Sequence, residues 1–335
     1  MSPPLALVIL ALLLLGPLLL APLERNLELY FLALGLISAL LAGCLDWEVA
    51  RKALTEPILI VIATVGAGLL FARTRARFDR FFARLRGSLP RPLLTALTVL
   101  VIAMAASVVT AIVAALILVE TTALLRLEDA QRIKVVIFGC FAIALGAVLT
   151  PIGEPLSTLA TSALGLGFLG LFRLLGAYVI PAMIILSTMA GIAARGDSQS
   201  TRAISTTSES LREVVTLGLK VFAFIAGLVL VGEAFAPIAG HYVSMLDGTR
   251  LYWANTVSAA LDNATLVALE FHQLSLERAR FALLSLLISG GMLIPGNIPN
   301  IVCAGTLHVS SYSWARIGVP LGAILLGIYF AVLVY

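Results

Sequence analysis

Long apolar runs, each of about 18 residues or more, dominate the chain. A run of that length crosses a hydrocarbon core about 30 Å thick. The pattern predicts apolar helical segments over about 4–20, 27–44, 57–72, 92–119, 133–170, 171–194, 214–235 and 317–335, with a further span beginning near 281. We therefore expect an all-α polytopic membrane protein.

The composition leaves no room for a soluble domain. The 335 residues are 61% hydrophobic and only 12% charged, and the mean hydropathy is +1.08. Most of the basic residues stand in short loops beside apolar runs, so they report orientation and not nucleic-acid binding. The cysteines and histidines are scattered singly, which predicts neither disulfides, nor cofactors, nor a metal site beyond a transported cation.

A basic stretch follows the third apolar run. Segment 73–91 holds seven arginines and one aspartate, while Phe78, Phe81, Phe82 and Leu85 recur at helical spacing. This favours an amphipathic helix at the membrane surface. The alternative is a basic loop, and both place the segment in the cytoplasm.

Two apolar runs are interrupted by proline and glycine. The run 133–170 is too long for one crossing and contains TPIGEP at 150–155, and the run from about 281 contains PGNIPN at 295–300. Regular helical hydrogen bonding cannot continue through such residues. We predict a discontinuous transmembrane helix at each site, because broken backbone is tolerated there only if protein or a cavity surrounds it.

The two interruptions occur in similar stretches of sequence. LTPIGEPLSTLA (149–160) aligns without gaps with LIPGNIPNIVCA (293–304), and each follows an apolar stretch that ends in Glu120 or Glu270. This indicates a duplication. We predict N-terminal scaffold helices over 1–56, a first repeat unit over 57–195, a polar cytoplasmic linker over 196–213 and a second repeat unit over 214–335.

Loop charges test how the units are oriented, because Lys and Arg accumulate in the cytoplasm. If 92–119 and 253–270 both cross the membrane, the 22 basic residues divide evenly. If both are re-entrant hairpins, 16 of the 22 lie inside. The second arrangement gives the units opposite topology, a recurrent design of secondary transporters. A competing geometry is an uninterrupted helix with one polar face, since Asn255, Ser258, Asp262 and Thr265 are spaced 3, 4 and 3.

The stretch 253–270 also supplies the first candidate site. It sets Asp262 and Asn263 inside an apolar segment, where a carboxylate costs about 2.5–3.5 kcal/mol on insertion scales. A group retained at that cost commonly faces a cavity and binds something. In the first half, the corresponding stretch SVVTAI has only Ser107 and Thr110 as polar residues, and the break carries Thr150 and Glu154.

These motifs resemble those of the ion transporter superfamily. ALDNATLVA is similar to the Asp-Asn hairpin motif of its sodium/proton antiporter branch, and TPIGEP and PGNIPN are similar to its helix breaks. The order of segments also resembles an uncharacterised family of predicted cation transporters. The resemblance implies one ion site lined by Asp262, Asn263, Thr265, Asn297 and Asn300.

The first half departs from that motif, because Glu154 stands where the second half has Ile298. If the breaks meet, Glu154 and Asp262 could share a cavity with Thr150, Ser258, Thr110, Ser107 and carbonyl oxygens. Oxygen ligands suit Na⁺ or another hard cation. Glu154 could instead cap the following half-helix, and Asn297 and Asn300 could instead bind backbone groups.

Desolvation raises the pKa of a buried carboxyl group, and a second acid nearby raises it further. A proton and a cation would therefore compete for the same carboxyl group. We therefore expect a secondary transporter of the cell inner membrane that exchanges Na⁺ or another small cation for H⁺, with a homodimer allowed by the resemblance. The alternatives are an arsenite or carboxylate transporter and an intramembrane enzyme. The enzyme is disfavoured because GxGD is absent and only one Asp lies deep in an apolar run.

Overall fold

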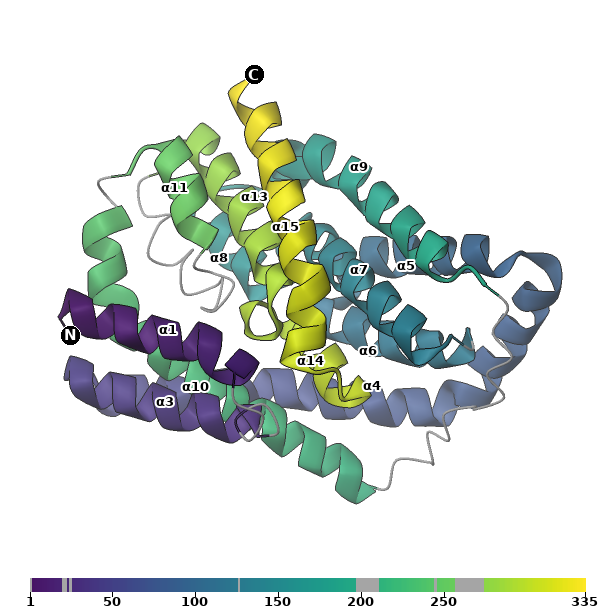
Figure 1. Cartoon of the computed structure of the whole chain (residues 1–335), viewed down its shortest axis with the longest axis horizontal. Coiled ribbons are helices and arrows are strands. Elements are labelled where there is room, and N and C mark those ends of the chain that lie inside the picture. The colour runs from purple at the N-terminus through teal and green to yellow at the C-terminus, as the bar shows by residue number, and fades with distance from the viewer. Residues whose placement is uncertain are drawn as a thin grey trace.

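The computed structural model describes residues 2–19, 23, 26–125, 127–196, 211–243, 246–256 and 274–335. Over these residues the regular structure is helical, without strands. The helices are α1 (Pro3–Leu19), α3 (Leu27–Ala42), α4 (Trp47–Ser88), α5 (Arg91–Val109), α6 (Ala111–Leu124), α7 (Asp129–Ala147), α8 (Pro155–Ala163), α9 (Gly170–Ala193), α10 (Leu211–Val243), α11 (Gly248–Ala254), α13 (Leu276–Met292), the short 3₁₀ helix η3 (Ile294–Gly296), α14 (Ile298–Leu307) and α15 (Ser311–Val334) (Figure 1).

Five helical segments among the described residues are long and apolar enough to cross a membrane. They are Arg91–Val109, Asp129–Ala147, Gly170–Ala193, Gly218–Ile238 and Ser311–Val334. This confirms the expected class of all-helical, multi-pass membrane protein.

Helix α4 differs from the sequence prediction. We expected a span to begin at Pro57 and a separate surface helix after residue 72, but one helix of 42 residues runs through both. The Asp46 side chain caps it by accepting a 2.9 Å hydrogen bond from the Val49 amide, so the helix is already established when it reaches Pro57. The part of segment 73–91 up to Ser88 is therefore a helix and not a loop, continuous with the preceding span.

Helices α1, α3, α4 and α10 form one layer along the lower side of Figure 1. Within it α3 and α10 run parallel. Glu28 pairs with Lys220 at 2.9 Å, and one turn later the Phe31 ring packs on Phe224 with ring centroids 4.6 Å apart, so residue numbers rise in the same direction along both helices. Their backbones touch further along: a Cβ on Gly35 would stand 2.4 Å from the Gly227 carbonyl oxygen. Small residues at such a contact allow close helix packing in membranes.

Helix α4 packs antiparallel to α10 in the same layer. Lys52 forms a 2.8 Å ion pair with Glu233, while Val61 and Val65 lie beside Gly218. The residue numbers rise along one helix as they fall along the other.

The remaining helices pack around α7 and α13, the two most buried ones. All eleven residues from Phe281 to Gly291 are buried, and α7 is buried from Val135 to Ala147 except at Phe138. The two helices meet where Gly291 leaves room for the Phe141 ring, whose nearest atom would lie 2.5 Å from an added Cβ.

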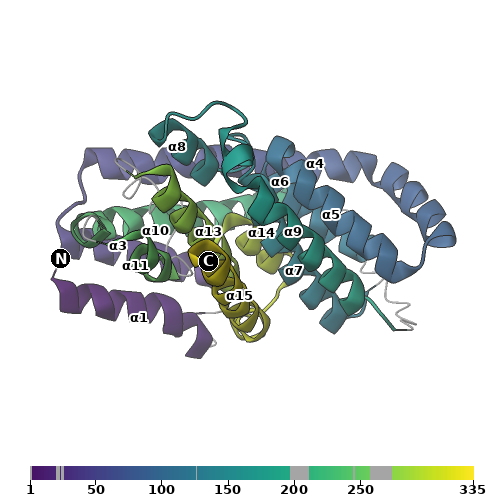
Figure 2. The same cartoon turned by 90° about the horizontal axis from the view of Figure 1, so that it is seen from above.

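Helix α9 contacts the two halves of the chain at its opposite ends. At its C-terminal end the Arg91 side chain donates to the Ala194 carbonyl at 3.0 Å and Gln131 donates to the Arg195 carbonyl at 2.7 Å. These two residues begin α5 and α7. Helices α5 and α6 are therefore an antiparallel pair that returns to the end where it started. Figure 2 shows this pair beside α7 and α9.

Towards its other end, α9 contacts the second half of the chain through Tyr178, which accepts two hydrogen bonds. Arg280, near the start of α13, donates to the Tyr178 hydroxyl at 3.4 Å, and the Tyr329 hydroxyl of α15 donates to the Tyr178 carbonyl at 2.7 Å. Sixteen residues of α9 separate this point from Ala194, or about 24 Å at 1.5 Å per residue. Helices α7 and α13 thus start at opposite ends of the helix bundle.

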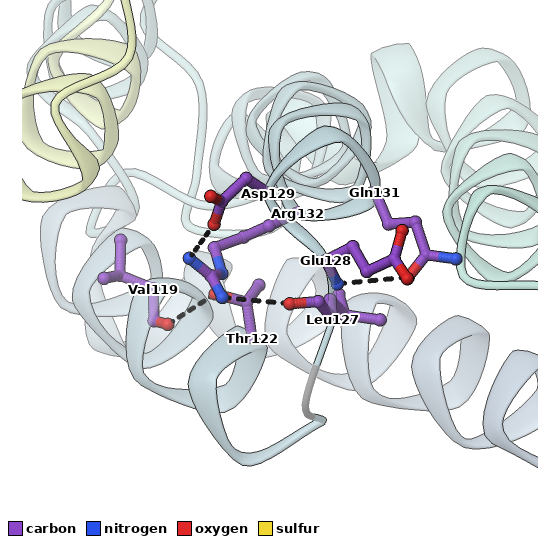
Figure 3. A network of polar contacts seen from close by, with 7 residues as sticks. All are labelled: Val119, Thr122, Leu127, Glu128, Asp129, Gln131 and Arg132. Carbon is purple, nitrogen blue, oxygen red and sulfur yellow. Dashed lines mark hydrogen bonds and ion pairs between the residues drawn. The ribbon is translucent and has the colours of Figure 1, made fainter. Parts of the chain in front are cut away.

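The start of α7 is ordered by the polar network of Figure 3. Arg132 pairs with Asp129 at 3.0 Å and donates to the Leu127 carbonyl at 2.9 Å. Glu128 and Gln131 form a reciprocal capping box at the start of α7. These contacts fix the first turn of α7 and tie it to Leu127, the residue before its cap.

Candidate functional site

The first helix break lies between α7 and α8 and contacts the tip of the α5–α6 pair. Thr150 donates a short hydrogen bond to the Ser107 carbonyl, and the Ala111 amide donates to the Gly153 carbonyl at 2.8 Å. The structure therefore confirms the break at 150–155 and brings Ser107, Thr110 and Thr150 together. The Ser107 hydroxyl itself bonds to Met104 within α5.

Thr110 joins α5 to α6 in an unusual backbone conformation, with φ 79° and ψ 151°. A positive φ is an outlier for a β-branched residue, and such strain costs about 1–3 kcal/mol. Its hydroxyl oxygen is buried and has no hydrogen-bond partner among the described residues. Strained, buried polar residues of this kind cluster at functional sites.

Glu154 precedes α8 directly and is 9% exposed. Its backbone is extended, and its side chain makes no capping hydrogen bond to α8. Of the two roles that the sequence left open, capping of the half-helix is therefore not seen. The carboxyl group lies at the positive end of α8, where a negative charge is stabilised.

The second break separates α13 from α14 and is spanned by Asn300, which is fully buried. Its Nδ2 atom donates to the Gly290 carbonyl at 2.8 Å and to the Leu293 carbonyl at 2.9 Å. Its Oδ1 atom, like Nδ2 of the buried Asn297, has no partner among the described residues. Asn300 thus binds backbone groups with its nitrogen, while its oxygen remains for another ligand.

Ser157 is a residue that the sequence analysis missed. Its hydroxyl donates across the first break to the Ala147 carbonyl at 3.3 Å. Ser157 and Asn300 are each the third residue of their half-helix, and each bonds to a carbonyl ten residues earlier. The gapless alignment pairs Ser157 with Ile301, the residue after Asn300, and so hides the correspondence between Ser157 and Asn300. Aligning the two half-helices by their first residues would have revealed it.

The second break is held against α7. The Cys140 thiol lies 3.8 Å from the Pro299 carbonyl in the first turn of α14. Cys140 stands seven residues before the end of α7, so the two breaks are separated by about 10 Å along that helix. The half-helices therefore begin at different depths along α7.

Four predicted site residues, Ser258, Asp262, Asn263 and Thr265, lie outside the described residues. The choice between a hairpin and a continuous helix for their segment stays open, as does the distance from Asp262 to Glu154. Asn255, the C-cap of α11, is described and buried. The described residues contain no group of three or more His, Cys, Asp or Glu side chains that could hold a metal ion.

Comparison with known proteins gives one family. A family model described as "Protein of unknown function (DUF1646)" matches residues 4–335. No curated protein matches the chain.

Proposed function

Because the chain belongs to the DUF1646 family, whose function is unknown, we propose a function from its geometry. The protein is a secondary active transporter that moves a small inorganic cation, Na⁺ above all, in exchange for protons. The observation that carries the proposal is the buried Glu154 carboxyl group at the start of a half-helix, beside the strained tip at Thr110.

Inverted repeats are the first part of the proposal. The starts of α5 and α7 contact one end of α9, whereas α13 begins about 24 Å away at Tyr178. The antiparallel pairing of α4 with α10 supports the same relation, since each of these helices forms the beginning of one unit. We propose that the α5–α6 pair is a re-entrant hairpin and that segment 253–270 is its inverted counterpart.

The chemistry follows from the oxygen atoms at the breaks. Glu154 and the hydroxyls of Thr110 and Thr150 supply hard ligands on one side, and the free oxygen of Asn300 supplies one on the other. Hard oxygen ligands select ions such as Na⁺. Asp262, with Asn263, Thr265, Ser258 and Asn297, completes the proposed ion pathway.

Proton coupling is a consequence of burial. A carboxyl group in a low-dielectric site holds its proton more strongly, and a bound cation displaces that proton. Cation binding on one side and protonation on the other then give exchange. Neither break contains Lys or Arg, so the anion alternative lacks a positively charged side chain at these points. No enzymatic role is proposed, and the inner-membrane location and the homodimer stay predictions.

Transport in liposomes tests the proposal. Purified protein with an enclosed pH dye should show proton movement when Na⁺ or Li⁺ is added outside. Glu154→Gln and Asp262→Asn should each abolish it. Glu277→Gln is the matched control, because Glu277 is an exposed carboxylate in the first turn of α13 and its loss should leave the rate unchanged.

Two results would contradict this function. One is proton movement by Glu154→Gln and Asp262→Asn at the wild-type rate. The other is uptake of arsenite or a dicarboxylate without proton movement by any cation. Size-exclusion profiles identify variants that have lost their fold, so that an inactive variant is interpreted only when it elutes as the wild type does.

A further inference from the structure

Two buried cysteines from distant parts of the chain meet between the breaks. Cys140 lies in the middle of α7 and Cys303 in α14, and both are 0% exposed. They lie on facing helices, because the Cys140 thiol approaches the carbonyl of Pro299, one helical turn before Cys303 in α14. The sequence analysis found them scattered singly along the chain, and the fold brings these two together.

Contacts with backbone carbonyl groups hold both thiols in place. Cys140 approaches the Pro299 carbonyl at 3.8 Å, and Pro299 is one helical turn before Cys303. The Cys303 thiol donates to the Ala115 carbonyl of α6 at 3.6 Å. The pair is therefore held by α6, α7 and α14, at the contact between the first and second halves of the chain.

We propose that Cys140 and Cys303 form a binding site for a soft cation that takes two ligands in a line, such as Hg²⁺, Ag⁺ or Cu⁺. Thiolate sulfur is the ligand that soft metals select. Two thiols held on facing helices within one turn of each other need only a small shift to take one ion between them. The site is distinct from the proposed Na⁺ pathway, whose ligands are oxygen atoms.

Charge balance decides how each ion is held. A buried site tolerates little net charge, and each thiol must lose its proton to become a strong ligand. With Hg²⁺, two S–Hg bonds form, both protons leave to the buffer and the complex is neutral. With Ag⁺ or Cu⁺, one thiol loses its proton and the other stays protonated, which is again neutral. No electrons are transferred in either case.

Binding is measured on the purified full-length protein with Hg²⁺ as the probe. One equivalent of HgCl₂ should remain with the protein through gel filtration in the presence of excess monothiol, with release of two protons per ion. After unfolding, the number of reactive thiols should fall from three to one, because the chain has three free cysteines. Ag⁺ should release one proton instead of two.

Single substitutions locate the site. Cys140→Ser and Cys303→Ser each leave one sulfur, so excess monothiol should strip the metal from both. Cys44→Ser is the matched control: Cys44 is the third free cysteine, lies at the end of α3 and is only partly buried, and its loss should leave binding unchanged. Alanine replacements at 140 and 303 repeat the test where a serine variant fails to fold.

The proposal is overturned if Cys140→Ser or Cys303→Ser retains Hg²⁺ against monothiol as the wild type does, or if Cys44→Ser loses it. This binding assay does not depend on transport activity. A protein that binds Hg²⁺ but moves no protons in liposomes would retain this site and refute only the transport function.

Discussion

Replacement of Asn300 by alanine should destabilise the protein strongly, whereas the same replacement of Asn297 should not. Asn300→Ala removes two hydrogen bonds and leaves the Gly290 and Leu293 carbonyl groups without that donor in a buried break. A hydrogen bond contributes about 0.5–1.5 kcal/mol net, and an unsatisfied buried group costs about 1–3 kcal/mol. We expect the free energy of unfolding to fall by about 2–4 kcal/mol.

Asn297 provides the matched comparison because it lies at the same break and is also buried. Its Nδ2 atom has no partner among the described residues, so Asn297→Ala loses no such bond. We expect a change below about 1 kcal/mol in the free energy of unfolding. If Asn297 is an ion ligand, its loss should instead remove the stabilisation that added Na⁺ gives to the wild type, because a ligand stabilises the state that binds it.

Denaturant titration in mixed micelles, followed by tryptophan emission, measures both variants. Of the three tryptophans, Trp314 alone is buried, and its indole donates to the Gly291 carbonyl at 3.1 Å. Its emission therefore reports on the α13–α14 break. Equal losses in the two variants, or an Asn300→Ala midpoint at the wild-type value, would refute the division of roles argued above.

Two further substitutions test packing. Ser157→Ala should lower the free energy of unfolding by about 0.5–1.5 kcal/mol, less than Asn300→Ala, because it removes one 3.3 Å bond across the first break; a larger loss would contradict this. Gly35→Ala should cost about 1–3 kcal/mol, because its Cβ would meet the Gly227 carbonyl oxygen at 2.4 Å. Gly327→Ala, with no neighbour within 4 Å of its Cβ, should gain about 0.5–1 kcal/mol, and similar denaturation midpoints for both glycine variants would argue against a close α3–α10 contact.

Both helix breaks were predictable from the sequence because the cause is local. Two prolines and a glycine lie within six residues at both 150–155 and 295–300, and regular helical hydrogen bonding does not continue through such a cluster. The same reasoning failed at Pro57, which lies inside α4. There the Asp46 cap and the contacts with α10 preserve the helix. Neither can be predicted from the presence of a proline.

The apolar runs by themselves determined that this chain is a bundle of membrane helices, since a backbone in hydrocarbon must satisfy its own hydrogen bonds. The polar residues of the breaks were also visible as exceptions to that pattern. Only the tertiary structure decided which atoms of Asn300 are used, that α3 lies parallel to α10, and that Cys140 of α7 packs against the first turn of α14, next to Cys303. The Asn300 bonds depend on how the chain turns back at the break, and the two helix contacts depend on residues far apart in the chain. Hydrophobic periodicity carries no information about which helix faces which.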